Sequence, residues 1–185
     1  FPKNTPQILV ILLLLGLAFF AGARFAPQSN LGAIGSLDER ANAPAPLASQ
    51  TLNKMFEFPL RDDNNREVAK ITYFLESASL QDAFIYQGKL AKAVVGRTFL
   101  ILNVKITNPY TKSININARD YVRIKVNDSK EQLAPEIHND PVEVQADSTK
   151  YTRIGLPIND TDTNLTLLIG ELDGKKQTIK LILER

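Results

Sequence analysis

From Met55 onward the apolar residues recur at every second position, and this period constrains the fold more than any other feature of the sequence. The alternating sets are Phe56, Phe58 and Leu60; Ile71, Tyr73 and Leu75; Leu100, Leu102, Val104 and Ile106; Ile114 and Ile116; Val122, Ile124 and Val126; Thr152, Ile154, Leu156 and Ile158; Leu165, Leu167 and Ile169; and Ile179, Leu181 and Leu183. Polar residues fill most of the positions between them. One-sided alternation is typical of antiparallel sheets with one solvated face. Roughly seven to nine short strands separated by turns predict an all-β, immunoglobulin-like antiparallel β-sandwich.

Two local signals refine this prediction. Pro157 lies inside one alternating run, which predicts an edge strand or a bulge because proline donates no ladder hydrogen bond. Asp173-Gly174 lies between the last two runs and predicts a tight hairpin turn.

The amino-terminal part of the chain has a different character. Ile8 to Ala23 is a run of sixteen residues without a charged or polar side chain. As a helix it would be roughly 24 Å long, slightly short of the roughly 30 Å of a hydrocarbon core. We expect a retained single-pass membrane anchor with the β-domain outside the cytoplasm. The alternative is a signal peptide, with Lys3 before the run and Ala21-Gly22-Ala23 as the cleavage site, and secretion after cleavage following Ala23.

The segment from Arg24 to Asn53 is rich in Ala, Ser, Asn, Gly and Pro and has no sustained apolar period. Such a composition buries too little surface to fold alone. The sequence therefore predicts three parts: an anchor or signal segment at 1–23, a flexible linker at 24–53 and a β-sandwich at 54–185. An apolar segment at the start also resembles that of type IV pilins, which implies a filament subunit. Thr5 stands where pilins carry Glu, and Pro2 and Pro6 would interrupt the helix.

Composition excludes several classes of function. Lys and Arg total 22 and Asp and Glu total 20, without a basic stripe, so no nucleic-acid partner is expected. The chain has no cysteine, which excludes disulfides, thiolate metal sites and cysteine nucleophiles. No cofactor is expected.

One strand carries a family resemblance. Gly96-Arg97-Thr98-Phe99, followed by the alternating Leu100 to Ile106 and then Asn108, resembles the signature strand of a bacterial immunoglobulin-like family of unknown function. That family includes a secreted mycobacterial immunoprotective antigen and related lipoprotein and membrane-anchored domains. Asp120-Tyr121 and Asp147-Ser148-Thr149, with the strands after them, extend the resemblance over about residues 68 to 184. It implies a sandwich with an extracytoplasmic address and no activity. The pattern departs at Asn127 to Lys130, where a hairpin glycine is expected.

Motifs for catalysis are absent from the sequence. The one histidine, His138, lies near Glu136 and Asp140 in a loop, and no second ligand type or nucleophile motif accompanies it. We therefore expect no enzyme.

Phe84 and Tyr86 lie in the least regular stretch of the domain, 68 to 95. They are candidates for a partner-binding patch, together with Glu136 and His138. The alternative is an additional edge strand that packs on the sandwich.

Asp160, Asp162 and Asn164, with Glu171 at the twelfth position, copy the spacing of a calcium-binding loop. Leu165 stands where the loop needs glycine, and its own alternation places it in a strand, so we expect a polar turn. A weak calcium site of another geometry remains an alternative.

Together these features predict a non-enzymatic, membrane-tethered binding or structural module that presents its β-sandwich to a protein or envelope partner. The loops Glu136–Asp147 and Asp160–Asn164 are the expected recognition surface. A calcium- or small-ligand-binding sensor and a pilin-like filament subunit are the alternatives. The sequence does not indicate the oligomeric state.

Overall fold

The computed structural model describes residues 44–184, and within them the chain is almost entirely β-structure. The elements are β1 (Ala48–Arg61), β2 (Glu67–Gln81), β3 (Ala83–Tyr86), β4 (Lys89–Lys92), β5 (Arg97–Asn108), β6 (Ile114–Ile116), the short 3₁₀ helix η2 (Ala118–Tyr121), β7 (Val122–Val126), β8 (Val142–Val144), β9 (Ser148–Asn159), β10 (Leu165–Ile169) and β11 (Gln177–Lys180). The described residues belong to one compact unit.

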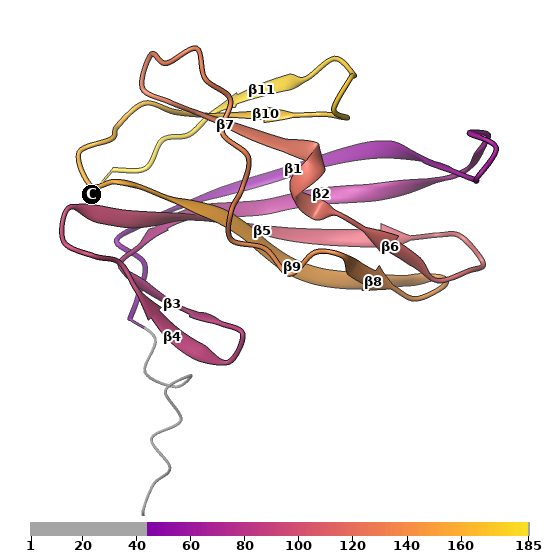
Figure 1. Ribbon diagram of the computed structural model, residues 1–185, viewed down its shortest axis with the longest axis horizontal. Helices are drawn as coiled ribbons and strands as arrows, with labels where there is room; N and C mark the ends of the chain where they lie inside the picture. The colour runs from indigo at the N-terminus through magenta and orange to yellow at the C-terminus, as the bar shows by residue number, and fades with distance from the viewer. Residues whose placement is uncertain (1–43, 185) are drawn as a thin grey trace, which may run out of the picture. The chain divides into compact units, whose positions relative to one another are not determined.

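Two antiparallel sheets form a β-sandwich. The larger has the strand order β1-β2-β5-β9 and the smaller has the order β11-β10-β7. Figure 1 shows the smaller sheet on one side of the larger one and the β3–β4 hairpin on the other side. The short pair β6–β8 completes the described β-structure. The prediction of an all-β, antiparallel sandwich is confirmed.

The core lies between the two sheets and is built by the residues that alternate in the sequence. Leu100, Leu102, Val104 and Ile106 of β5 are fully buried, and the alternating residues of β2, β7, β9 and β10 pack against them. Burying such a side chain contributes about 1.5–3 kcal/mol relative to leaving it exposed, so the two-residue period decides which face of each strand turns inward.

The expected amino-terminal segment, Ile8 to Ala23, lies outside the described residues. Within residues 44–184, no helix has the length and apolar character that crossing a bilayer requires.

The sandwich begins earlier than the sequence predicted. Strand β1 starts at Ala48, so the expected linker, 24–53, overlaps the first part of this strand. Ala48 and Leu52 are buried in the core, but only small or polar residues lie between them, and this weakens the sequence signal.

The predicted tight hairpin at Asp173-Gly174 is wrong in its length. Strands β10 and β11 do pair antiparallel, but Ile169 pairs with Gln177, so residues 170–176 connect them. Gly174 donates its N–H to the carbonyl of Glu171 in a local turn inside this longer loop. Asp173 and Gly174 therefore belong to a local turn within the loop and do not connect β10 directly to β11.

Pro157 lies in β9, which is an edge strand of the larger sheet, as predicted. Its position facing Phe99 leaves the ladder with β5 continuous from Arg97 to Asn108.

Asn127 explains the missing hairpin glycine. It has a φ of 54°, a left-handed conformation that asparagine tolerates better than most residues.

Asn108, at the end of the signature strand, is fully buried. Its side-chain amide donates to the carbonyls of Lys112, Val144 and Gln145 and accepts from the N–H of Tyr110.

The sandwich has two ends, which are named here for use below. The entry end, where the described chain begins, holds Pro44–Leu47 and the loops at 82, 93–96, 127–132, 160–164 and 181–184. The far end holds the loops at 62–66, 109–113 and 170–176. Figure 1 shows the entry end at the left of the molecule.

Candidate functional site

The β3–β4 hairpin covers part of the outer face of the larger sheet. Phe99 lies on the outer face of β5, and Phe84 packs edge-on against it with ring centroids 5.0 Å apart. Phe84 is only 3% exposed, and Ile101, also on the outer face, is fully buried. Phe84 therefore acts as an anchor for the hairpin, and its ring is not available as a contact surface. The additional strand that the sequence allowed is β3, but it pairs with β4 in a separate hairpin and does not extend an edge of the larger sheet.

Tyr86 and His138, both candidates from the sequence, meet beside the turn of this hairpin. The hydroxyl of Tyr86 donates to the backbone carbonyl of His138 over 2.9 Å. Glu136 lies on the same loop and is exposed. The loop itself is held to the edge of the larger sheet, because Ile137 and Gly155 exchange two backbone hydrogen bonds.

Asp140 organises the polar groups around His138. Its buried carboxylate accepts from the backbone N–H groups of Ala118 and Arg119 at 2.9 and 3.1 Å. The Arg119 guanidinium lies 3.9 Å from the same carboxylate. These contacts hold the 134–141 loop against the 3₁₀ helix η2.

The ring of His138 lies between two donors. Nδ1 faces the backbone N–H of Asp140 at 3.1 Å, and Nε2 faces the Arg119 guanidinium at 2.8 Å. Backbone N–H and guanidinium groups can only donate, and a neutral imidazole accepts at only one of its two nitrogens, so the tautomer decides which contact is a hydrogen bond. Both nitrogens face protein groups, and neither is aimed at a ligand. We name Tyr86, Arg119, His138 and Asp140 the loop junction. Its contacts are those of a structural joint.

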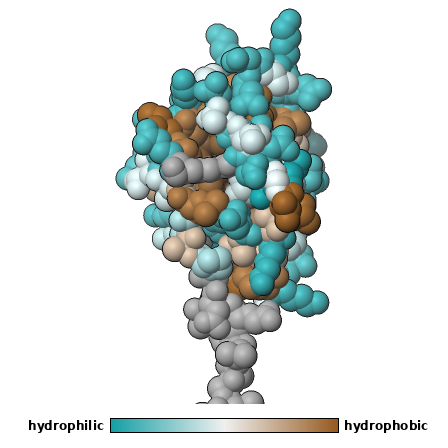
Figure 2. All heavy atoms as spheres, turned by 90° about the vertical axis from the view of Figure 1, so that its left-hand side faces the viewer, coloured by the Kyte–Doolittle hydropathy of each residue, from teal (hydrophilic) through white to brown (hydrophobic). Residues whose placement is uncertain are grey.

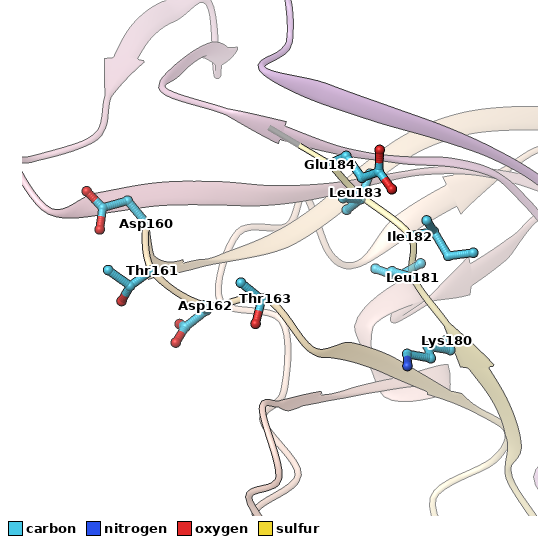
Figure 3. A pocket seen from close by; sticks show the side chains of 9 residues that line it. All are labelled: Asp160, Thr161, Asp162, Thr163, Lys180, Leu181, Ile182, Leu183 and Glu184. Atoms are coloured by element: carbon cyan, nitrogen blue, oxygen red, sulfur yellow. The ribbon is translucent and has the colours of Figure 1, made fainter.

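The second group of sequence candidates lines a cleft at the entry end (Figure 3). The turn Asp160–Thr163 forms one wall and the segment Lys180–Glu184 forms the other, around a volume of about 540 Å³. Leu181 at its base is buried, whereas Ile182 is exposed.

Asp162 is already committed to structural hydrogen bonds. One carboxylate oxygen accepts from the side-chain amide of Asn127 at 2.9 Å, and the other accepts from the backbone N–H of Asn159 at 2.8 Å. Asp160 and Asn164 are exposed. No group of three or more His, Cys, Asp or Glu side chains in residues 44–184 is arranged to hold a metal ion. The turn thus brings Asp160 and Asp162 together without a convergent set of free oxygens.

A third feature, on the outer face of the larger sheet, was not predicted from the sequence. Met55, Phe74, Lys105 and Tyr151 lie side by side across β1, β2, β5 and β9, one residue from each strand. We name these four residues the outer-face row. The ammonium group of Lys105 lies 5.5 Å from the ring centroid of Phe74 and 5.9 Å from that of Tyr151, within cation–π range. Met55 is 66% and Tyr151 64% exposed.

The alternation alone indicates that single members of the outer-face row point outward, but not that they are neighbours. Met55, Phe74 and Tyr151 occupy positions between the core residues, where the other strands carry Asn, Lys, Arg and Thr. Large apolar or aromatic residues at such positions either pack under another element or form a contact surface. Phe99 is of the first kind, because the hairpin covers it. Met55 and Tyr151 are of the second kind.

Comparison with known proteins gives the fold and no function. No family model matches the chain, and no curated protein matches it. The resemblance to the family of the mycobacterial antigen is therefore without support from these comparisons. A solved structure described as a conserved hypothetical protein from Bacillus anthracis matches with a TM-score of 0.51 and 13% identity, over 74% of this chain and 100% of that chain. An uncharacterized β-sandwich protein from Clostridium difficile 630 matches with a TM-score of 0.49 and 14% identity, over 68% of this chain and 90% of that chain. The described part of the chain is a β-sandwich similar in fold to the first of these proteins.

Proposed function

We propose that the chain is a non-enzymatic, extracytoplasmic binding module, tethered to a membrane through Ile8–Ala23, that presents an immunoglobulin-like β-sandwich to a protein or envelope partner. The immunoglobulin-like topology is supported by the strand orders β2-β5-β9 and β11-β10-β7, with β1 as an additional edge strand. The membrane tether rests on the length and apolar character of Ile8–Ala23.

The outer-face row is the observation that carries the binding role. The exposed side chains on this sheet face, Met55 and Tyr151, are of residue types that are enriched in protein interfaces. Aromatic side chains on a rigid sheet contribute much contact area and lose little conformational entropy on binding. We therefore assign the partner contact to this row in preference to the loops Glu136–Asp147 and Asp160–Asn164. Internal hydrogen bonds already occupy Asp140 and Asp162, one from each of these loops.

Site-specific photo-cross-linking in membranes of the native host tests the binding role. A benzophenone amino acid in place of Tyr151 is expected to yield a discrete adduct with one partner. The same amino acid in place of Leu172, an exposed residue of the far end, is the matched control. Lys105→Ala should weaken the adduct at position 151, because it removes the charged side chain beside Phe74 at the centre of the row. Identical adduct patterns at positions 151 and 172 would contradict a specific interface at the row.

The tether is tested separately, by the intact mass of the protein in membrane and soluble fractions. A membrane-bound species that retains Ile8–Ala23 is the expected result. A soluble species that begins at Arg24 would replace the tether by secretion.

A further inference from the structure

Exposed apolar side chains gather at the entry end of the sandwich. Of the nine large apolar side chains that are exposed in the described residues, four lie there: Leu47, Val94, Val95 and Ile182. Val95 is fully exposed and Val94 is 71% exposed. Figure 2 faces this end and shows brown, apolar areas between hydrophilic ones. We name these four residues the entry-end patch.

Backbone contacts bring the four residues of the patch to the same end. Leu47 donates its N–H to the carbonyl of Leu80 at the end of β2. The N–H of Ala93, next to Val94, donates to the carbonyl of Asp82, which follows Leu80 by two residues. The N–H of Ile182 donates to the side chain of Gln50, near the start of β1. None of these four side chains contributes to the core between the sheets.

The position of the patch in the chain indicates what covers it. The described chain begins at this end, and Ile8–Ala23 precedes it in the sequence with only residues 24–43 between that run and Pro44. If these twenty residues form the linker that their composition predicts, their root-mean-square span is roughly 25 Å. A bilayer that holds Ile8–Ala23 would thus lie close to the entry end, at an effective concentration at which a weak contact suffices.

We infer that the entry-end patch docks on the surface of the lipid bilayer, so that the sandwich stands with its strands pointing away from the membrane. This inference rests on the proposed membrane tether. Apolar side chains gain free energy when a bilayer interface removes their surface from water, and this contact needs no pocket. The exposed cations Lys92 and Lys130 lie at this end, but they are outnumbered there by the exposed acids Asp82, Asp128, Glu131 and Asp160. The apolar side chains therefore drive the contact, and neutral lipid is sufficient for it.

The orientation has a consequence for the binding role. Strand β1 has fourteen residues, so the far end would stand roughly 40 Å from the bilayer. The outer-face row then faces sideways, parallel to the membrane, where a neighbouring envelope protein can reach it.

Spin labelling of the full chain tests the inference directly, because the chain has no cysteine of its own. Val95→Cys and the control Leu172→Cys each receive one nitroxide, and each full chain is reconstituted at one copy per nanodisc of phosphatidylcholine. Both positions are exposed, so neither substitution removes a core contact. The label at position 95 is expected to collide several-fold less with a water-soluble nickel chelate than the label at position 172, and more with oxygen dissolved in the lipid. Replacing Val94 with Asn in the Val95→Cys chain should reverse part of this difference.

Equal nickel accessibility at positions 95 and 172, on chains that elute with the nanodiscs, would overturn the docking and leave the tether intact. Chains that do not elute with the nanodiscs would instead overturn the tether itself, and the docking with it. The two failures are therefore distinguishable in one preparation.

Discussion

At the scale of single residues, Asp160 and Asp162 show how neighbouring carboxylates in one turn differ in their roles. Asp162 is 8% exposed, and its two oxygens connect the turns at 127–129 and 159–163. Asp160 is exposed, and its backbone N–H donates to the carbonyl of Gly96. The sequence shows two equivalent acids, and only the fold decides which of them is used.

Replacing Asp162 with Ala is expected to lower the free energy of unfolding by about 2 kcal/mol, because the N–H of Asn159 and the amide of Asn127 both lose an acceptor. Asp160→Ala, the matched control, should change it by less than about 0.5 kcal/mol. Urea denaturation of both variants measures the difference. Equal losses in both, together with a calcium-dependent rise in Tm of the parent protein, would instead support the calcium site.

At the scale of strands and hairpins, alternation predicted most of the β-structure correctly. The inward face of β5, from Leu100 to Ile106, follows from the two-residue period alone, since a shift of one residue would expose every core side chain. The β3–β4 hairpin could not be predicted with the same certainty. It is held by tertiary contacts, such as the packing of Phe84 on Phe99, that leave no periodic pattern in so short a segment.

The candidate sites were harder to predict, for a related reason. Sequence patterns indicated Tyr86 and His138, which do meet, but not that their contact joins the β3–β4 hairpin to the 134–141 loop. The outer-face row was missed because its members come from four strands, and their adjacency depends on register.

Substitution of Gly155 tests how closely strands β5 and β9 pack against each other. It pairs with Ile101, and a Cβ at this position would collide with the backbone carbonyl of Leu100 and lie 3.0 Å from Cδ1 of Ile101. Since a backbone atom cannot rotate away, Gly155→Ala should lower the free energy of unfolding by about 3 kcal/mol.

Gly174→Ala is the control for that variant, because the nearest atom to its new Cβ is the Cβ of Glu171 at 3.3 Å, in an exposed loop. Its effect should stay within about 0.5 kcal/mol. Urea unfolding compares the two proteins, and similar midpoints for both would show that β9 shifts away from β5 without cost.

At the scale of the whole molecule, one continuous core connects both sheets, and Tyr73 lies in it. Its side chain is fully buried, and its hydroxyl donates to the carbonyl of Ala118 on the 3₁₀ helix η2. Burial raises the pKa of the Tyr73 phenol well above its usual value near 10, and the nearby negative charge of Asp140 and then Tyr121 add to this rise. Burial also raises the pKa of Tyr121, whose ring stacks on Phe58 beside Tyr73.

The raised pKa of Tyr73 predicts how the stability of the whole sandwich depends on alkaline pH. The folded state keeps the phenolic proton while the unfolded chain loses it above about pH 10, so the free energy of unfolding should fall there by up to about 1.4 kcal/mol per pH unit. Below pH 10 both states are protonated, and the contribution is fully present.

Tyr73→Phe should be about 1 kcal/mol less stable at neutral pH, because the carbonyl of Ala118 loses its donor. It should also show a flatter decline above pH 10, so that the two curves converge. Urea titrations between neutral pH and pH 11 measure both effects, with the exposed Tyr151→Phe as the control. Parallel curves for the parent protein and Tyr73→Phe would mean that the phenol of Tyr73 titrates in the folded state as it does in the unfolded chain, and thus that solvent reaches the centre of this core.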